Sequence, residues 1–111
     1  MTGGTGAADG AKDALVRDLA QQTGPSGVRV AGIWTAGLTD SLSAGKLGAT
    51  LGTPVSQEMF DGIVASLDAA RMTRKSPLTT QIAATAAFLA SDDAAPITAT
   101  WINATAGMFP S

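Results

Sequence analysis

Three stretches of the chain carry apolar residues at intervals of three or four positions, the spacing of one helix face. The first spans residues 11–22 and is followed by a Gly-Pro pair at 24–25, which ends helices. The second spans residues 54–72, and the third runs from a capping threonine at 79 or 80 to about residue 91. The pattern therefore predicts three amphipathic helices.

Two short runs rich in β-branched and aromatic residues, 27–34 and 97–104, predict strands. Between them, residues 35–53 follow no period and are rich in glycine, serine and threonine, so we predict a long loop there. A strand, a helical crossover and a second strand form a right-handed unit with parallel strands. Because parallel sheets are normally wider than two strands, the chain is predicted to be the edge of a doubly wound α/β sheet.

Composition removes several classes of function. Of the 111 residues, 45% are hydrophobic and 14% are charged, and the net charge is −2, so we expect a folded domain that does not bind nucleic acid. The chain has no cysteine and no histidine, which excludes thiolate nucleophiles, serine-histidine triads and imidazole metal ligands. No apolar run has membrane-spanning length and the first residues lack a signal-peptide core, so we expect no membrane contact and a cytoplasmic location.

The opening "TGGTG" at residues 2–6 resembles a phosphate-binding turn only superficially. Such a turn leaves a buried strand, whereas only Met1 stands upstream of Thr2, and no Gly-Lys-Ser/Thr follows to supply a phosphate-binding lysine. We therefore expect a flexible N-terminus in preference to a phosphate cradle.

Other charged and aromatic residues have structural interpretations that we prefer. The cations in "RMTRK" at residues 71–75 can complement the dipole of a helix C-terminus, with a phosphate site as the alternative. Asp92 and Asp93 are adjacent without a second acidic cluster, which favours a solvated turn over a metal site. Trp34 and Trp101 lie on the two predicted strands and are expected to be core residues.

Three motifs resemble the C-terminal half of the short-chain dehydrogenase/reductase family. "ALVRDLAQQTGPSGVRV" (residues 14–30) is similar to the family's active-site helix and sixth strand. "AATAAFLASDDAAPIT" (83–98) resembles its late helix, although Ala99 stands where the family usually has glycine. "INATAGMF" (102–109) resembles its closing strand, in which Asn-Val-Asp-Gly-Gly is common. The resemblance implies one partial Rossmann-like domain over residues 1–111.

The family's catalytic Tyr-x-x-x-Lys pair has no counterpart in this chain. A match without gaps from the first motif puts Thr5 at the tyrosine position and Asp9 at the lysine position. Thr5 has no group that titrates near neutral pH, and the Asp9 anion would raise the pKa of a neighbouring acid, where the family's lysine lowers it. Lys12 would serve only after a three-residue deletion, and the chain has no tyrosine in any register. We predict no catalytic residue here and a solvated Lys12.

The resemblance implies NAD or NADP as cofactor, but the glycine-rich turn and the residue that selects between them belong to the half of the fold that is missing here. We do not expect this chain to bind the cofactor by itself. What corresponds to the family's nicotinamide-contacting segment is "WTAGLT", although its proline is absent. The candidate cofactor-binding residues are Trp34, Thr35, Ala36, Gly37, Leu38 and Thr39.

Two functional hypotheses follow from these features. In the first, the chain is a truncated short-chain dehydrogenase/reductase, inactive alone, whose partner is the missing N-terminal half. In the second, it is a non-catalytic oligomerisation or pseudoenzyme module, because the helices that commonly form subunit contacts keep their apolar faces. Either way, an unpaired sheet edge leads us to expect a homo-oligomer or a molten state for the isolated chain.

Overall fold

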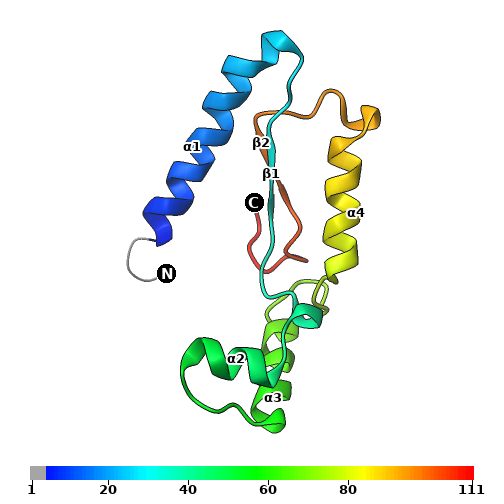
Figure 1. Cartoon of the computed structure of the whole chain (residues 1–111). Coiled ribbons are helices and arrows are strands. Elements are labelled where there is room, and N and C mark those ends of the chain that lie inside the picture. The colour runs from blue at the N-terminus through cyan, green and yellow to red at the C-terminus, as the bar shows by residue number, and fades with distance from the viewer. Residues whose placement is uncertain (1–4) are drawn as a thin grey trace. The chain divides into compact units, whose positions relative to one another are not determined.

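The computed structural model describes residues 5–111 and has a mixed α/β architecture (Figure 1). Its elements in chain order are α1 (Thr5–Thr23), η1 (Gly24–Ser26), β1 (Ala31–Trp34), η2 (Thr39–Ser41), α2 (Ala44–Leu51), α3 (Gln57–Ala69), α4 (Thr79–Ala90), η3 (Asp92–Ala94) and β2 (Thr100–Asn103). The chain divides into two compact units. Unit 1 comprises Met1–Ile33 and Ala86–Ile102, and unit 2 comprises Trp34–Thr85 and Asn103–Ser111.

In unit 1, β1 and β2 form a two-stranded parallel sheet, as the sequence predicted. The pairing begins just before the strands, where the Ala99 amide donates to the Val30 carbonyl at 2.8 Å and the Val30 amide donates to Thr98 Oγ1 at 3.0 Å. Arg29 reinforces this end by donating to the carbonyls of Ile97 at 3.1 Å and Ser91 at 3.2 Å. Arg29, which lies just before β1, therefore binds the segment that leads into β2.

Gly32 lies directly under the indole of Trp101, where the two strands are in contact. A Cβ atom at position 32 would approach three ring carbons of Trp101 to between 2.3 and 2.6 Å, far inside van der Waals contact. The half-buried indole thus fills the space that a larger residue in β1 would need. Trp101 packs against Gly32 of the neighbouring strand but is half-buried, so the expectation of a core residue holds only in part.

Helix α1 is longer than the apolar pattern predicted, because it begins at Thr5 instead of Ala11. Of the added residues, Ala7 and Ala8 favour helix, whereas Gly6 and Gly10 do not, and none of them gives an apolar period. On the solvated side, Arg17 donates to Asp13 at 2.7 Å. Among the described residues of α1 only Ala20 is buried, and Leu15 remains 55% exposed.

The expectation of one long loop over residues 35–53 was wrong, since unit 2 contains η2 and α2 in that stretch. Ser43 caps α2 by accepting the Lys46 amide at 3.1 Å, and Gly52 ends it in a left-handed conformation. These local caps stabilise a helix of eight residues. Its glycines interrupt the apolar period that would otherwise predict it. Ser56 caps α3 in the same way by accepting the Met59 amide at 3.1 Å.

The connector from α3 to α4, residues 70–78, is held by hydrogen bonds inside unit 2. At the end of α3, Asp68 accepts the Ser76 amide at 2.8 Å and also the hydroxyl of the same serine, which is buried. The Thr73 amide donates to the Ala106 carbonyl at 3.3 Å. The connector is therefore joined both to α3 and to the segment that follows β2.

Candidate functional site

The predicted cofactor segment Trp34–Thr39 starts at the last residue of β1 and runs into η2. In doubly wound folds, ligands bind beyond the carboxyl ends of the strands, which is where this segment lies. Ala36 to Thr39 are half-buried, while Thr35 is exposed and Trp34 is 40% exposed. The expectation that Trp34 is a core residue was therefore wrong: it is the end of a strand and faces solvent in part.

The carbonyl groups of this segment are largely engaged within unit 2. Trp34 accepts the Ala104 amide at 2.9 Å. Leu38 accepts both the amide and the hydroxyl of Ser41, at 3.1 and 2.8 Å, and Thr39 accepts the Leu42 amide at 3.3 Å. These bonds fix the backbone path of the segment where it turns into η2.

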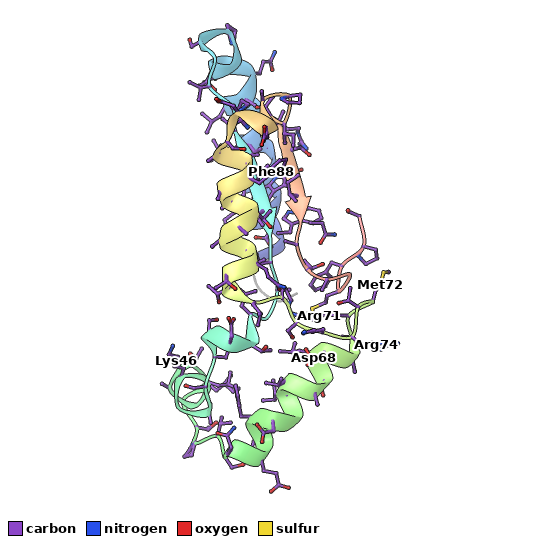
Figure 2. All side chains as sticks on the ribbon, turned by 90° about the vertical axis from the view of Figure 1, so that its right-hand side faces the viewer. Lys46, Asp68, Arg71, Met72, Arg74 and Phe88 are labelled. Carbon is purple, nitrogen blue, oxygen red and sulfur yellow. The ribbon has the colours of Figure 1, made fainter. Side chains whose placement is uncertain are left out.

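Two of the other three carbonyls, those of Ala36 and Gly37, bind Arg71, a residue whose role sequence analysis missed. Arg71 was predicted to complement the dipole of a helix C-terminus; it does follow the end of α3, but its side chain is 1% exposed. Its Nη2 donates to the carbonyls of Ala36 and, at 3.0 Å, of Gly37, while its Nη1 donates to the Leu67 carbonyl at 3.2 Å. Figure 2 shows Arg71 and Asp68 close to the C-terminal end of α3, with Met72 reaching outward.

The buried guanidinium of Arg71 is solvated by backbone dipoles. Within the described residues no carboxylate lies within ion-pair distance of it, and its fourth contact is the sulfur of Met108, 3.8 Å from Nη1. The Nε atom of Arg71 is buried and has no hydrogen-bond partner among the described residues. Arginine cannot lose its charge in a protein, so this cation depends on the carbonyls that surround it.

Asp40 anchors the other end of the segment to α4. Its carboxylate accepts the Thr79 amide at 3.0 and 3.1 Å and the Thr79 hydroxyl at 2.8 Å. The side-chain bond from Thr79, followed by the backbone bond, lowers the pKa of Asp40 below its usual 3.8. An acidic group from η2 thus supplies the N-terminal cap of α4 from 39 residues away.

The other cations of residues 71–75 do not converge with Arg71. Arg74 donates to the Ala69 carbonyl, in keeping with the predicted placement at a helix C-terminus, and Lys75 is exposed. Asp92 and Asp93 are exposed in η3, as expected for a solvated turn. Over residues 5–111 no cluster of three acidic side chains that could hold a metal is found.

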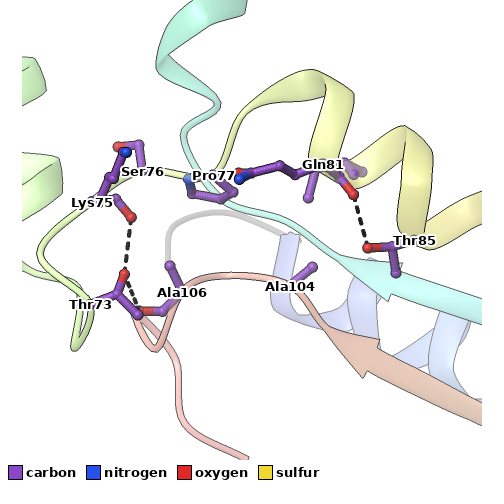
Figure 3. A pocket seen from close by; sticks show the side chains of 9 residues that line it. Thr73, Lys75, Ser76, Pro77, Gln81, Thr85, Ala104 and Ala106 are labelled. Atoms are coloured by element: carbon purple, nitrogen blue, oxygen red, sulfur yellow. Dashed lines mark hydrogen bonds between the residues drawn. The ribbon is translucent and has the colours of Figure 1, made fainter.

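Unit 2 also has an open groove of about 360 Å³ between the start of α4 and the segment after β2 (Figure 3). Ile82, Ala104 and Ala106 give it an apolar floor. The hydroxyl of Thr73 donates to the Lys75 carbonyl at 3.1 Å and that of Thr85 to the Gln81 carbonyl at 3.0 Å, so both are already engaged. Lys75 is the one charged residue among those that line the groove, so the groove offers space but no paired acid and base.

Both positions that correspond to the family's catalytic pair lie in the first half of α1. Thr5 is the first helical residue of α1, and Asp9 is exposed. Lys12 has an exposed side chain whose Nζ is 3.8 Å from Asp9, which confirms that it is a solvated residue. Residues 2–4 of the "TGGTG" stretch lie outside the described residues.

Comparison with known proteins identifies the family. A family model described as enoyl-(acyl carrier protein) reductase matches residues 2–109. The chain therefore belongs to the short-chain dehydrogenase/reductase family that this model represents. No curated protein sequence matches the chain. No helix in the described part of the chain is long and apolar enough to cross a membrane.

Solved structures share the fold at low sequence identity. Sorbitol-6-phosphate 2-dehydrogenase from Erwinia amylovora is 21% identical over 95% of this chain, with a TM-score of 0.73 and 41% of that enzyme covered. A short-chain dehydrogenase family protein from Francisella tularensis is 21% identical over 89%, with a TM-score of 0.67 and 40% covered. A 4-hydroxyisoleucine dehydrogenase complexed with NADH is 19% identical over 93%, with a TM-score of 0.66 and 38% covered. The chain thus spans about two fifths of the solved proteins it matches.

Proposed function

We propose that this chain is the C-terminal part of an NAD(P)-dependent short-chain dehydrogenase/reductase and that Trp34–Thr39 forms one wall of its nicotinamide site. The observation that supports this most strongly is the family match over nearly the whole chain, together with a half-buried, hydrogen-bonded segment at the carboxyl end of β1. A bound cofactor would supply hydride transfer. The segment Trp34–Thr39 would contribute backbone groups that orient the cofactor's ring.

This chain has no evident proton donor, which the reduction of a carbonyl needs in addition to a hydride. Reduction of a carbonyl adds a hydride to carbon and a proton to oxygen, so an acid must stand beside the substrate oxygen. The chain contains no tyrosine, cysteine or histidine, and Lys12 is solvated and pairs with Asp9. We therefore propose that this chain supplies no proton donor of its own and that the site for the cofactor's phosphates belongs to a nucleotide-binding half that completes the sheet beside β1.

A chimera tests the proposed cofactor wall. The part of the Erwinia amylovora enzyme that this chain matches would be replaced by residues 11–111, with that enzyme's own residues kept upstream. We expect the chimera to bind NADH or NADPH, measured by quenching of tryptophan fluorescence. The matched control chimera carries Gly37→Val, which blocks the segment, and should lose at least tenfold in affinity. Equal affinity of the two folded chimeras would count against a cofactor wall at Trp34–Thr39.

A second candidate function, a non-catalytic oligomerisation module, is favoured by α1. This helix exposes Leu15 and Leu19, 55% and 38% of whose surfaces are accessible, on the same side one turn apart. Apolar side chains of this kind on a helix that buries only Ala20 mark a surface for another protein subunit. If the chimera folds but binds neither cofactor, and the isolated chain forms a discrete dimer, this second function is preferred.

A further inference from the structure

Arg71 is a cation buried without an anion, and its hydrogen bonds are concentrated on the candidate cofactor segment. Burying a charge is unfavourable unless other groups replace its water. Two of the three carbonyls that do so here belong to Ala36 and Gly37, more than thirty residues earlier in the chain. The third carbonyl, that of Leu67, belongs to the last turns of α3, four residues before Arg71. The hydrogen bonds of Arg71 to the carbonyls of Ala36 and Gly37 therefore indicate that it fixes the backbone at these two residues.

The hydrogen bonds to the carbonyls of Ala36 and Gly37 also set the direction of the N–H groups that follow them. All described peptide bonds are trans, so the C=O and the following N–H of each peptide point in opposite directions. With the carbonyls of Ala36 and Gly37 turned to Arg71, the N–H groups of Gly37 and Leu38 turn away from it. Within residues 5–111 neither of these two amides donates to a protein acceptor. Two consecutive amide donors therefore face away from the guanidinium.

Gly37 makes this arrangement possible. Its φ of 54° lies in the left-handed region, which side chains other than glycine rarely adopt. A Cβ atom would also lie 3.2 Å from Leu67 Cδ1 and 3.3 Å from Arg71 Nη2. A left-handed residue next to successive amides that point the same way is the geometry by which backbone forms an anion- or oxygen-binding nest. Arg71 and Gly37 thus fit together as a unit.

We propose that Arg71 is a positioning residue: by binding the carbonyls of Ala36 and Gly37, it holds the amides of Gly37 and Leu38 as a paired donor for an oxygen atom of a ligand. The ligand class is a carboxamide or carboxylate, whose oxygen accepts two hydrogen bonds from one side. The identity of that ligand rests on the proposed function, whereas the positioning role of Arg71 does not.

The positioning role is tested on the ligand-free full chain by nuclear magnetic resonance of its backbone amides. We expect Arg71→Met to shift or broaden the amide signals of Gly37 and Leu38 while leaving those of α2 in place. Arg71→Lys should restore them in part, because an ammonium can still donate to a carbonyl. Arg74→Met is the matched control, since it removes the same charge from an exposed side chain. Unchanged Gly37 and Leu38 signals in Arg71→Met would overturn the proposal.

A measurement on the unmodified chain decides the matter if Arg71→Met does not fold. We expect the Nη protons of Arg71 to exchange slowly with solvent and to show scalar coupling to the carbonyl carbons of residues 36 and 37. The Gly37 and Leu38 amides should exchange at least tenfold faster than the amides of the α3 interior. Fast exchange of the Arg71 protons, or protection of those two amides, would overturn the proposal.

The ligand is probed separately with nicotinamide at millimolar concentration. In the unmodified chain and in Arg74→Met, we expect the largest shifts at the Gly37 and Leu38 amides, and shifts at least threefold smaller in Arg71→Met. If nicotinamide moves no amide of Trp34–Thr39 in the unmodified chain, the cofactor wall in the proposed function is contradicted. The role of Arg71 is then still decided by the ligand-free spectra, so the two failures are distinguishable.

Discussion

Ala99 and Ala106 both adopt left-handed backbone conformations, with φ of 58° and 57°. For an L-residue this conformation costs about 1–2 kcal/mol. The family usually has glycine after Ile-Thr, at the position of Ala99, and the pattern Asn-Val-Asp-Gly-Gly puts glycine at the position of Ala106. The backbone of this chain has therefore kept conformations for which its own residues are poorly suited.

We expect Ala99→Gly to stabilise the chain by about 0.5–1 kcal/mol, because relief of the left-handed strain exceeds the added chain entropy of glycine. The measurement is the urea midpoint at a fixed protein concentration. Ala87→Gly, in the exposed interior of α4, is the matched control and should lower the stability by roughly 1 kcal/mol. A destabilised Ala99→Gly variant would show that residue 99 is not left-handed in solution.

Asp40 gives unit 2 a pH-dependent contact. In the folded chain, the hydrogen bonds from Thr79 lower the pKa of Asp40 below its usual 3.8. The contribution of Asp40 to stability is therefore complete above that usual value. It is lost as the pH falls through the lower, folded pKa. We expect Asp40→Ala to lower the unfolding temperature at pH 7. Below pH 3, the unfolding temperatures of Asp40→Ala and the unmodified chain should lie closer together. A difference that stays constant between pH 7 and pH 2 would contradict the capping role.

At the scale of elements, α4 and α2 show what the sequence could reveal. Helix α4 was predicted with bounds close to those observed, because a proline, capping threonines and an apolar period agree there. Helix α2 was missed because Gly45 and Gly48 interrupt its pattern and its caps are local. The candidate segment Trp34–Thr39 could be proposed from resemblance. Arg71 could not, because a cation near a helix end is normally solvated and only its contacts reveal its burial.

The two strands are in close contact at Gly32. We expect Gly32→Ala to destabilise the chain by roughly 1–3 kcal/mol, because its new methyl group would overlap the indole of Trp101. The near-UV circular dichroism of the tryptophans should fall with it. Gly10→Ala in α1 is the control: no atom lies within 4 Å of its Cβ, so it should stabilise the helix by about 0.5–1 kcal/mol. Equal effects of the two substitutions would contradict the observed strand contact.

At the scale of the whole molecule, α1 exposes Leu15 and Leu19, and the sheet of the described residues has only two strands. A sheet of two strands is marginal by itself, and an unpaired strand edge invites association. We expect the isolated chain to self-associate, with an unfolding temperature that rises with protein concentration. The double substitution Leu15→Lys and Leu19→Lys should shift sedimentation toward the monomer. A concentration-independent, cooperative transition of a monomer would instead favour a self-sufficient module.

We propose that residues 34–39 form one wall of a cofactor site that a nucleotide-binding half completes. Calorimetric titration of NADH and of NADPH into the purified 111-residue chain tests this claim most directly. We expect no saturable binding at micromolar to low millimolar cofactor, because the sequence has no counterpart of the family's glycine-rich turn that follows a strand and binds the cofactor's phosphates. Saturable binding with a micromolar dissociation constant and one cofactor per chain would contradict the account.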